Sequence, residues 1–308
     1  MKERADRAGA TWRELRSQTN ELLGDAIQTR WLLEKASGLD SAHLLRELDE
    51  KVPPGAAATL ESLVRRRLAG EPLQHVLGHW AFRSLEVLVD SRVLVPRPET
   101  EVVVAVALST LERLCSPSPG PGAPGPGTEV PPGGTDLLLV DLGTGSGVIA
   151  LSLAAERGGV RVIATDRDPA ALEVAAVNLA QLPVEAAARV ELRLGDWYQA
   201  LPLELAGRVT LVVANPPYVA EHEWAGLDPQ VRGFDPYGAL VAGPSGLEAI
   251  ETIVNGAPKW LACHAALVVE IAPHQAAAAL EIAGEAGFPN ASVERDLTGR
   301  ARVLVAER

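Results

Sequence analysis

The chain has 308 residues, 47% of them hydrophobic and 22% charged, which is enough for one large domain or two smaller ones with apolar cores. Its 28 lysines and arginines against 40 aspartates and glutamates leave a formal charge of −12, which argues against a protein that mainly grips nucleic-acid phosphates. The two cysteines lie in no metal-ligand spacing, and no apolar run reaches the roughly 18 residues that span a bilayer. The N-terminus lacks the apolar core of a signal peptide, so we expect a reduced, cytoplasmic protein.

The first 78 residues carry the apolar spacing of short helices. Apolar residues recur three or four positions apart in several stretches, the last of which follows the pair Pro53-Pro54. Gly70 is placed to end that last helix. The sequence therefore predicts an all-α domain over residues 1–78.

The pattern changes between residues 79 and 96. Two short apolar runs, LEVLV and RVLV, are separated by Asp90 and Ser91, which favour a turn. We expect a β-hairpin here, connecting the helical domain to a second domain over residues 97–308.

Residues 116–135 hold seven prolines and six glycines in twenty positions. Such a segment buries too little apolar surface to offset the entropy of ordering it. The sequence before it predicts a helix and the sequence after it predicts a buried strand. We therefore expect a flexible insertion within one domain.

From residue 137 onward, strand-like and helix-like segments alternate. The strand-like segments are LLLVD, VRVIATD, VELRLGD, VTLVVA, ALVVEI and two closing runs near 291–295 and 302–306. Near-continuous Val/Ile/Leu strands separated by helices are typical of a parallel sheet covered on both faces. The predicted fold class is α/β, with a mostly parallel, doubly wound sheet.

A glycine-rich turn follows the first of these strands and leads directly into a helix. Its residues are Asp141, Gly143, Thr144, Gly145, Ser146 and Gly147. Glycines let the backbone turn sharply and approach a ligand closely, beside the free amides of a helix N-terminus. A dinucleotide fingerprint would need a glycine where Val148 stands, and a Walker loop would need a Gly-Lys-Ser/Thr sequence that is absent. The turn by itself leaves a purely structural role open.

Aspartates also end the next two strands. Asp166 closes the second strand, where a carboxylate in this architecture accepts hydrogen bonds from the ribose hydroxyls of an adenosine ligand. Asp166 or Asp168 could instead cap the helix that begins at Pro169, and Asp168 suits that role better. Asp196 and Trp197 close the third strand and add an acceptor and a flat ring. Together these residues predict a nucleoside site at one edge of the sheet.

The strand VTLVVA leads into the tetrad Asn215-Pro216-Pro217-Tyr218. The two prolines remove two N–H donors, so the local backbone can only accept hydrogen bonds. We expect the side chain of Asn215 and the carbonyl of Pro216 to hold both N–H bonds of a planar NH2 group and to orient its nitrogen toward a methyl donor. Tyr218 supplies an aromatic face against the substrate or a nearby sulfonium. A tight proline turn without function is the structural alternative.

These motifs together resemble the Rossmann-like, class I S-adenosylmethionine-dependent methyltransferases that modify planar amino groups. Adenine-N6 DNA methyltransferases and protein glutamine-N5 methyltransferases share the NPPY tetrad. The segments VLVPRPETE (93–101) and GEPLQHVLGHWAF (70–82) resemble the glutamine group specifically. The chain is thus similar to the peptide chain release factor glutamine methyltransferase (PrmC/HemK) family.

The resemblance implies methylation of the glutamine in the Gly-Gly-Gln motif of bacterial class 1 release factors, with the helical domain helping to hold that partner. It implies S-adenosylmethionine as cofactor, and we expect no metal, no nucleic-acid binding and a monomer. The expected cofactor-binding residues are Asp141, Gly143, Thr144, Gly145, Ser146, Gly147, Asp166, Asp196, Trp197 and Asn215. The expected substrate-binding residues are Asn215, Pro216, Pro217, Tyr218, Arg97 and Glu99, with Asn215, Pro216 and Tyr218 catalytic. For Arg97 and Glu99, bracing the loop or capping a helix is the open alternative.

Two weaker signals accompany these motifs. His75 and His79 have the i, i+4 spacing of a metal site, but Gly78 is expected to end the helix between them. Six of the twelve aromatic residues lie between Trp197 and Tyr237, and we expect them to wall the pocket, with Tyr198 and Phe234 packing elsewhere. Residues 219–245 are expected to form a loop over that pocket.

Four other functions share some of these features. A glutamine methyltransferase acting on a ribosomal protein has the same motifs. An adenine-N6 nucleic-acid methyltransferase usually needs a basic target-recognition region, which the charge of −12 opposes. A nicotinamide-dependent oxidoreductase is opposed by Val148 and by the tetrad, and a non-catalytic adaptor is opposed by the intact tetrad.

Overall fold

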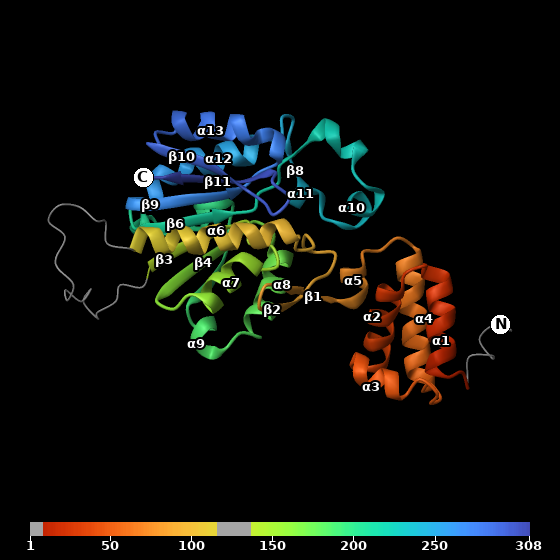
Figure 1. Ribbon diagram of the computed structural model, residues 1–308. Coiled ribbons are helices and arrows are strands. Elements are labelled where there is room, and N and C mark those ends of the chain that lie inside the picture. The colour runs from red at the N-terminus through yellow and green to blue at the C-terminus, as the bar shows by residue number, and fades with distance from the viewer. Residues whose placement is uncertain (1–8, 116–136) are drawn as a thin grey trace. The chain divides into compact units, whose positions relative to one another are not determined.

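Figure 1 shows the computed structural model of the protein, which describes residues 9–115 and 137–308. The insertion predicted at residues 116–135 lies outside the described residues. None of the helices in the described ranges combines the length and the apolar character that crossing a bilayer requires.

The chain divides into two compact units. One unit consists of Met1–Trp80 and Asp228–Phe234, and the other of Ala81–Leu227 and Asp235–Arg308. The first unit is built from helices and the second contains the large sheet. The second unit has the predicted α/β class, and the first contains the predicted N-terminal helical region.

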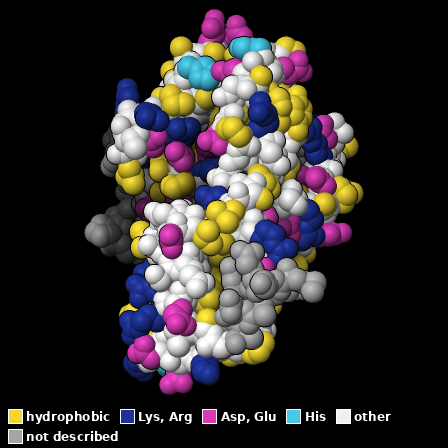
Figure 2. Space-filling model, turned by 90° about the vertical axis from the view of Figure 1, so that its right-hand side faces the viewer, with side chains coloured by type: hydrophobic (Ala, Val, Ile, Leu, Met, Phe, Trp, Pro, Cys, Tyr) yellow, Lys and Arg dark blue, Asp and Glu magenta, His cyan; other side chains and the backbone are white. Residues whose placement is uncertain are grey.

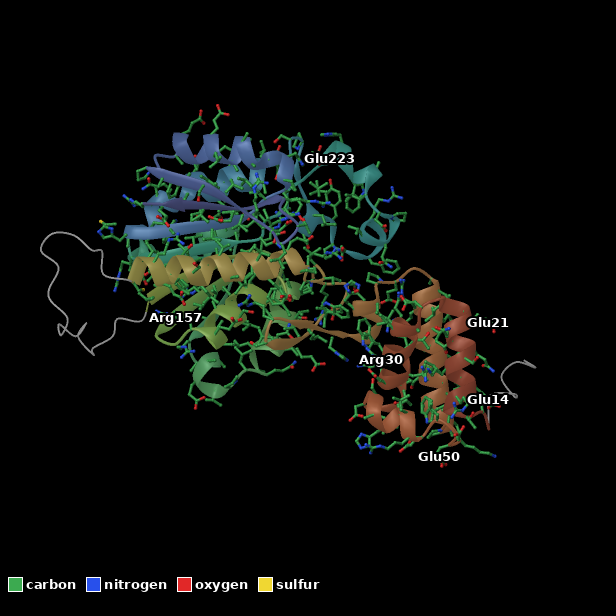
Figure 3. The ribbon with its side chains drawn as sticks, in the orientation of Figure 1. Glu14, Glu21, Arg30, Glu50, Arg157 and Glu223 are labelled. Atoms are coloured by element: carbon green, nitrogen blue, oxygen red, sulfur yellow. The ribbon has the colours of Figure 1, made fainter. Side chains whose placement is uncertain are left out.

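Local signals set where the helices of the first unit begin and end. Its helices are α1 (Trp12–Leu23), α2 (Ala26–Ser37), α3 (Ser41–Arg46), α4 (Pro54–Leu68), α5 (Leu73–Leu77) and α10 (Pro229–Phe234). Thr11 and Glu14 form a capping box at the start of α1, and Gly24 ends it in the left-handed conformation. Trp12 is buried in the helical core, whereas Glu14 and Glu21 lie on the exposed side of the same helix (Figure 3). This amphipathic arrangement is the one that the apolar spacing predicts.

Helix α10 lies far along the sequence from the other helices of this unit. Nε2 of Gln230 donates a hydrogen bond to the carbonyl of Gly70 at 2.9 Å. A Cβ atom at Gly70 would stand 3.9 Å from the ring of Phe234, so the predicted packing residue Phe234 lies beside that glycine. α4 ends at Leu68 and Gly70 adopts a φ of +91°, as expected for a residue that follows a helix end.

The predicted hairpin exists, but its strands differ from the prediction. Strands β1 (His79–Phe82) and β2 (Leu85–Leu88) form a two-stranded sheet. The turn therefore lies at Arg83, whose φ is +52°, and not at Asp90-Ser91. The backbone N–H of Arg83 donates to the carboxylate of Glu101 at 3.2 Å, which helps to hold this unusual conformation.

The run RVLV was wrongly predicted as a strand. Asp90 accepts a hydrogen bond from the backbone N–H of Arg92, which makes a local Asx-type turn. Val93 and Val95 are buried without belonging to a strand, and Val93 packs with Ala171 of the same unit. Alternating burial along an extended segment produced the same pattern as a strand.

The second unit is organised by a seven-stranded sheet with the order β10-β11-β9-β6-β3-β4-β5. Its strands are β3 (Leu137–Leu142), β4 (Val160–Asp166), β5 (Val190–Leu194), β6 (Val209–Ala214), β9 (Leu261–Glu270), β10 (Asn290–Arg295) and β11 (Ala301–Glu307). The five strands from β9 to β5 pair in parallel, and β11 and β10 pair antiparallel at one end. The predicted mostly parallel sheet is confirmed.

Helices cover both faces of this sheet. They are α6 (Pro98–Cys115), α7 (Val148–Glu156), α8 (Pro169–Leu179), α12 (Glu248–Trp260) and α13 (Ala276–Glu285). The short helix α9 (Val184–Ala187) packs on α7, and α11 (Tyr237–Leu240) packs on the short strand β8 (Val241–Gly243). Figure 1 shows α6 and α7 on one side and α12 and α13 on the other. The strand order reverses at β3, which has β4 on one side and β6 on the other, and ligands of open α/β sheets bind at such a switch point.

The segment 219–245 is not a plain loop, as the sequence had suggested. It contains the short parallel strands β7 (Val219–Ala220) and β8 (Val241–Gly243), with α10 and α11 between them. Its prolines start these short helices rather than breaking structure, because proline is tolerated at a helix start.

Tyr198 packs in the sheet unit as predicted. Its ring stacks on Trp260 of α12 with centroids 6.0 Å apart, and its hydroxyl donates to the carbonyl of Ile253 at 2.8 Å. A Cβ atom at Gly256 of the same helix would stand only 2.6 Å from the Tyr198 ring. Gly256 therefore makes room for the tyrosine at the cost of helix propensity.

We expect Gly256→Ala to lower the free energy of unfolding by about 1–3 kcal/mol, because the added methyl group overpacks the core at Tyr198. Gly284→Ala in α13 is the matched control, since its Cβ would meet no described atom within 4 Å. That variant should be neutral or stabilised by up to about 1 kcal/mol. Urea titrations of both variants measure the difference, and equal stabilities would contradict this packing account.

Candidate active site

A cavity of about 250 Å³ lies at the carboxyl ends of the parallel strands. Four segments that follow β3, β4, β5 and β6 contribute to it, because parallel strands present these ends at one edge. The predicted site residues that line the cavity are Gly143, Thr144, Gly145, Ser146, Asp166, Asp196, Trp197, Asn215, Pro217 and Arg97. The structure thus brings the separate sequence motifs to one place.

The glycine-rich turn is held from beneath by Asp141. One oxygen of this carboxylate accepts hydrogen bonds from the hydroxyl of Thr144 at 2.6 Å and from the backbone N–H of Ala150 at 3.1 Å. The other oxygen, Oδ1, has no hydrogen-bond partner among the described residues. Asp141 is 0% exposed, and this burial raises its pKa to about 7. Asp141 does not line the cavity, so its contact is with the turn.

Two glycines of the turn allow close packing. Gly143 has a φ of +72°, and a Cβ there would stand 3.2 Å from the ring of Trp197. Gly147 has a φ of +87°, and a Cβ there would stand 3.1 Å from Leu151 and 3.3 Å from Ala175. Gly147 lies outside the cavity lining and serves helix packing, whereas Gly143 lets the Trp197 ring lie against the turn.

Trp197 itself has a φ of +46°, in the left-handed region that side chains other than glycine rarely adopt. Non-glycine residues in this region cost free energy and cluster at functional sites. The strained backbone places the indole ring at the cavity, next to Asp196.

Asp166 lies between the turn and the next helix. Its Oδ2 accepts from the backbone N–H of Gly145 at 2.8 Å, and its Oδ1 accepts from the backbone N–H of Asp168 at 2.9 Å. Asp168 caps α8 by accepting from Ala170 N–H at 2.8 Å, which confirms the predicted helix cap. Burial is the largest influence on Asp166 and raises its pKa. Each of its oxygens keeps a second lone pair for a ligand in the cavity.

The Asn-Pro-Pro-Tyr turn is connected to two residues that sequence reasoning missed. Nδ2 of Asn215 donates to Oγ1 of Thr100 at 3.0 Å, and the hydroxyl of Thr100 donates to Oε2 of Glu270 at 2.9 Å. Tyr218 also hydrogen-bonds to Glu270 with its hydroxyl. Asn215 and Pro217 line the cavity, whereas Pro216 and Tyr218 are not among its lining residues. Thr100 lies within the segment VLVPRPETE (93–101), and Glu270 ends a buried strand as Asp166 does. Both residues therefore had a sequence feature that could have pointed to the site.

Glu270 is a second buried carboxyl group at this edge of the sheet. It is 1% exposed, and burial raises its pKa to about 7 against the opposing effects of Thr100 and Arg302. Burial also raises the pKa of Tyr218 to about 12, with a further contribution from the charge of Glu270. Both groups are therefore held in an environment with little water.

Asn178 links the hairpin to the glycine-rich turn and was also missed. Its Nδ2 donates to the carbonyls of Ser146 at 2.9 Å and Leu88 at 3.1 Å, and its Oδ1 accepts from the Leu88 N–H at 2.6 Å. A buried asparagine in the last turn of α8 has no local sequence pattern that marks it as functional.

Arg97 and Glu99 differ in position. Nη2 of Arg97 forms an ion pair with the buried Asp235 at 2.6 Å while lining the cavity, so it braces the segment and faces the site at once. Glu99 does not line the cavity, and its negative charge raises the pKa values of Glu270 and Tyr218.

The prediction that aromatic residues wall the pocket is largely wrong. Among the residues that the structure describes, only Trp197 of the predicted group lines the cavity. Trp224 and Tyr237 instead form an edge-to-face pair with centroids 4.9 Å apart, and Tyr237 is 52% exposed. These aromatic residues are close in the sequence but do not gather around the cavity, because the segment 219–245 folds into short helices and strands of its own.

The described part of the chain contains no group of three or more His, Cys, Asp or Glu residues that could hold a metal ion. Gly78 ends α5 with a φ of +75°, so His75 lies on that helix and His79 lies beyond it in β1. The helical spacing that first suggested a metal pair is therefore not kept.

Comparison with known proteins identifies relatives over nearly the whole chain. The model for the PrmC N-terminal domain matches residues 14–78, and that for the methyltransferase small domain matches residues 134–227. The chain is 39% identical to a release factor glutamine methyltransferase of Cereibacter sphaeroides over 91% of this chain and 90% of that protein. It is 38% identical to the Burkholderia pseudomallei protein of the same name, over 90% of each.

A solved structure supports the fold alone. The catalytic domain of hMettl16 in complex with MAT2A 3'UTR hairpin 6 matches with a TM-score of 0.50 and 15% identity, over 82% of this chain and 80% of that one. At this identity the similarity concerns the arrangement of strands and helices.

The buried Asp141 predicts a specific pH dependence of stability. Its pKa is about 7 in the folded protein against an ordinary value of 3.8, so the folded state binds this proton more tightly than the unfolded chain. Raising the pH from 6 to 8 removes that proton, which by itself should lower the free energy of unfolding by about 1.4 kcal/mol. Asp141→Asn has no such proton, so its free energy of unfolding from urea titration should change less over this range. An equal pH dependence in both proteins would contradict the assignment to Asp141.

Proposed function

Because this chain belongs to the release factor glutamine methyltransferase family, we propose that it methylates the side-chain amide nitrogen (N5) of the glutamine in the Gly-Gly-Gln motif of class 1 peptide chain release factors. The methyl donor is S-adenosylmethionine, and the other product is S-adenosylhomocysteine. The observation that carries this proposal is that Asn215 of the acceptor-rich tetrad and Asp166 of the nucleoside site line one cavity.

The residues of the cavity fit this cofactor. Gly145 lines the cavity, and a Cβ there would meet no described atom within 4 Å, so the turn leaves open space where a ligand can approach its backbone. The carboxylate of Asp166 has lone pairs for the two ribose hydroxyls, and the ring of Trp197 offers an apolar face for adenine. Gly143, Thr144, Ser146 and Asp196 complete the expected contacts, with Asp141 and Gly147 supporting the turn. When bound, S-adenosylmethionine supplies a methyl group on a positively charged sulfur.

The tetrad supplies orientation rather than a strong base. The amide nitrogen of glutamine is a poor nucleophile because its lone pair is delocalised into the carbonyl. The side-chain oxygen of Asn215 and the carbonyl of Pro216 each accept one N–H bond of the substrate, which aims the nitrogen at the methyl group. The new C–N bond forms as the C–S bond breaks, and the methylated nitrogen then loses one proton.

Other parts of the chain are assigned by the same proposal. Residues 1–78 form the domain that holds the release factor, residues 79–96 connect it, and residues 97–308 carry out the transfer. Pro217 and Tyr218 shape the substrate side of the tetrad, and Arg97 contacts the substrate segment while Glu99 acts through its charge. We propose a monomer that uses no metal and does not bind nucleic acid directly.

Surface charge favours a protein substrate over a nucleic acid. The chain has a formal charge of −12, and Figure 2 shows acidic and basic side chains interspersed on the face in view. Adenine-N6 methylation of nucleic acid would draw its affinity from neutralised phosphates. A glutamine of a ribosomal protein has the same chemistry as the release factor glutamine, and the names of the relatives favour the release factor.

The direct test is to incubate the protein with S-adenosylmethionine and purified release factor and to map the Gly-Gly-Gln peptide by mass spectrometry. We expect one added methyl group on the glutamine and none in a release factor in which this glutamine is replaced by alanine. Parallel incubations contain ribosomal proteins or adenine-containing DNA. Methylation of one of these instead of the release factor would overturn the proposed substrate.

Two variants separate chemistry from cofactor binding. Asn215→Ala should lower the turnover number by about 10²–10³-fold through loss of an oriented acceptor, while the dissociation constant for S-adenosylmethionine stays within about threefold. Asp166→Ala should weaken S-adenosylmethionine binding by about 10–100-fold, because a charged hydrogen-bond acceptor is lost. Asn290→Ala, on the exposed strand β10, is the control and should change neither quantity. Calorimetry and single-turnover kinetics measure the two effects, and full activity of Asn215→Ala would refute the role of the tetrad.

A further inference from the structure

We propose that Thr100 and Glu270 are positioning residues that fix the side-chain amide of Asn215 with its oxygen toward the cavity. The proposal rests on the function proposed above, since it concerns how the same site presents an acceptor to the substrate nitrogen. Thr100 comes from α6 and Glu270 from the end of β9, 170 positions apart in the sequence.

Asn215, Thr100 and Glu270 form a hydrogen-bond relay. The order of donors and acceptors in this relay leaves one orientation for the side-chain amide of Asn215. An ionised carboxylate only accepts hydrogen bonds, so the single hydroxyl hydrogen of Thr100 is directed to Oε2 of Glu270 at 2.9 Å. The oxygen of Thr100 can then only accept from its other neighbour. That neighbour is Nδ2 of Asn215 at 3.0 Å. In the flipped orientation, Oδ1 of Asn215 and the Thr100 oxygen would be two acceptors facing each other without a hydrogen between them.

Burial makes this relay strict. Thr100 is 2% exposed and Glu270 is 1% exposed, so water does not readily supply replacement hydrogen bonds. Because the carboxamide is planar, engaging Nδ2 on Thr100 turns Oδ1 away from Thr100. Asn215 lines the cavity, so its oxygen is the acceptor available to the substrate.

The orientation of Asn215 decides whether the site can work. A substrate NH2 group brings two donors and needs acceptors. A flipped Asn215 would present its own NH2 group, and two donors would then oppose each other. The relay excludes this state before substrate arrives, so no binding energy is needed to select the productive orientation.

The direction of the relay depends on the ionisation of Glu270. The charged and titratable groups that face it are Tyr218 from the tetrad, Arg302 from β11 and Glu99 from α6. Its pKa of about 7 means that the carboxylate predominates above this pH and the acid below it. A protonated Glu270 can donate to the Thr100 oxygen, which frees the Thr100 hydrogen for Oδ1 of Asn215 and permits the flipped state. Methyl transfer should therefore become faster as the pH rises through about 7.

The first experiment compares threonine variants on one helix. Thr100→Val keeps the shape of the side chain but removes the hydroxyl, and Thr100→Ser keeps the hydroxyl. Thr110→Val is the matched control, because Thr110 is also buried on α6 but lies outside the cavity lining. Each is assayed for release factor methylation, S-adenosylmethionine binding and thermal unfolding.

We expect Thr100→Val to lower the turnover number at least about tenfold with a dissociation constant for S-adenosylmethionine within twofold of the starting protein. Thr100→Ser should recover most of the lost rate, and Thr110→Val should keep the full rate. A Thr100→Val protein that folds, binds cofactor and turns over at the full rate would overturn the proposal. An equal loss in Thr110→Val would overturn it as well, since the effect would then be one of packing.

The second experiment follows the turnover number from pH 6 to pH 8. The unmodified protein should show an inflection near pH 7 that is absent from Glu270→Gln, which cannot ionise. An inflection that persists unchanged in Glu270→Gln would count against the relay. If Glu270→Gln does not fold, the same profile is recorded for Thr100→Val, in which the relay is already broken and the inflection should also be lost. Absence of release factor methylation by the unmodified protein would instead reject the proposed function, so the two failures are distinguishable.

Discussion

The hydrogen bonds that Asp141 accepts hold the glycine-rich turn at the end of the first parallel strand, and the rest of the site is arranged around that turn. Thr144 and the start of α7 are bound to one oxygen of this carboxylate. The turn then presents the Gly145 amide to Asp166 and leaves room for the ring of Trp197 against Gly143. Burying a carboxylate lowers the free energy of unfolding. At Asp141 this loss accompanies the hydrogen bonds that fix the position of the turn.

Two buried acids, Asp141 and Glu270, lie at the same edge of the sheet on different strands. Each has its pKa raised by burial, and each accepts hydrogen bonds from side chains that hold a neighbouring segment in place. Folding would be easier with apolar residues at these positions. The turn and the side chain of Asn215 need hydrogen-bond acceptors at these positions to be oriented. The two buried acids therefore lower the stability of the fold while they hold the site in its working arrangement.

Local chemistry and chain topology account for different parts of the structure. The cap at Asp168 and the glycine at the end of α5 act within a few residues, and the sequence revealed both. The capping box at Thr11 is just as local, although it was not predicted from the sequence. The run after Asp90 was misread as a strand because buried extended segments and strands share one apolar pattern. The membership of α10 in the helical unit has no local signal, since it depends on a contact between Gln230 and Gly70.

The sequence by itself determined the α/β class, the alternation of strands and helices that makes a mostly parallel sheet, and the residue types that mark the site. These follow from apolar periodicity and from motifs whose chemistry is complete within a few positions, such as the acceptor-rich turn after β6. Only the tertiary structure decided which buried groups support those motifs. Thr100 and Glu270 become partners of Asn215 because α6 and β9 pack beside β6, and hydrogen bonds between segments so far apart leave no periodic trace in the chain.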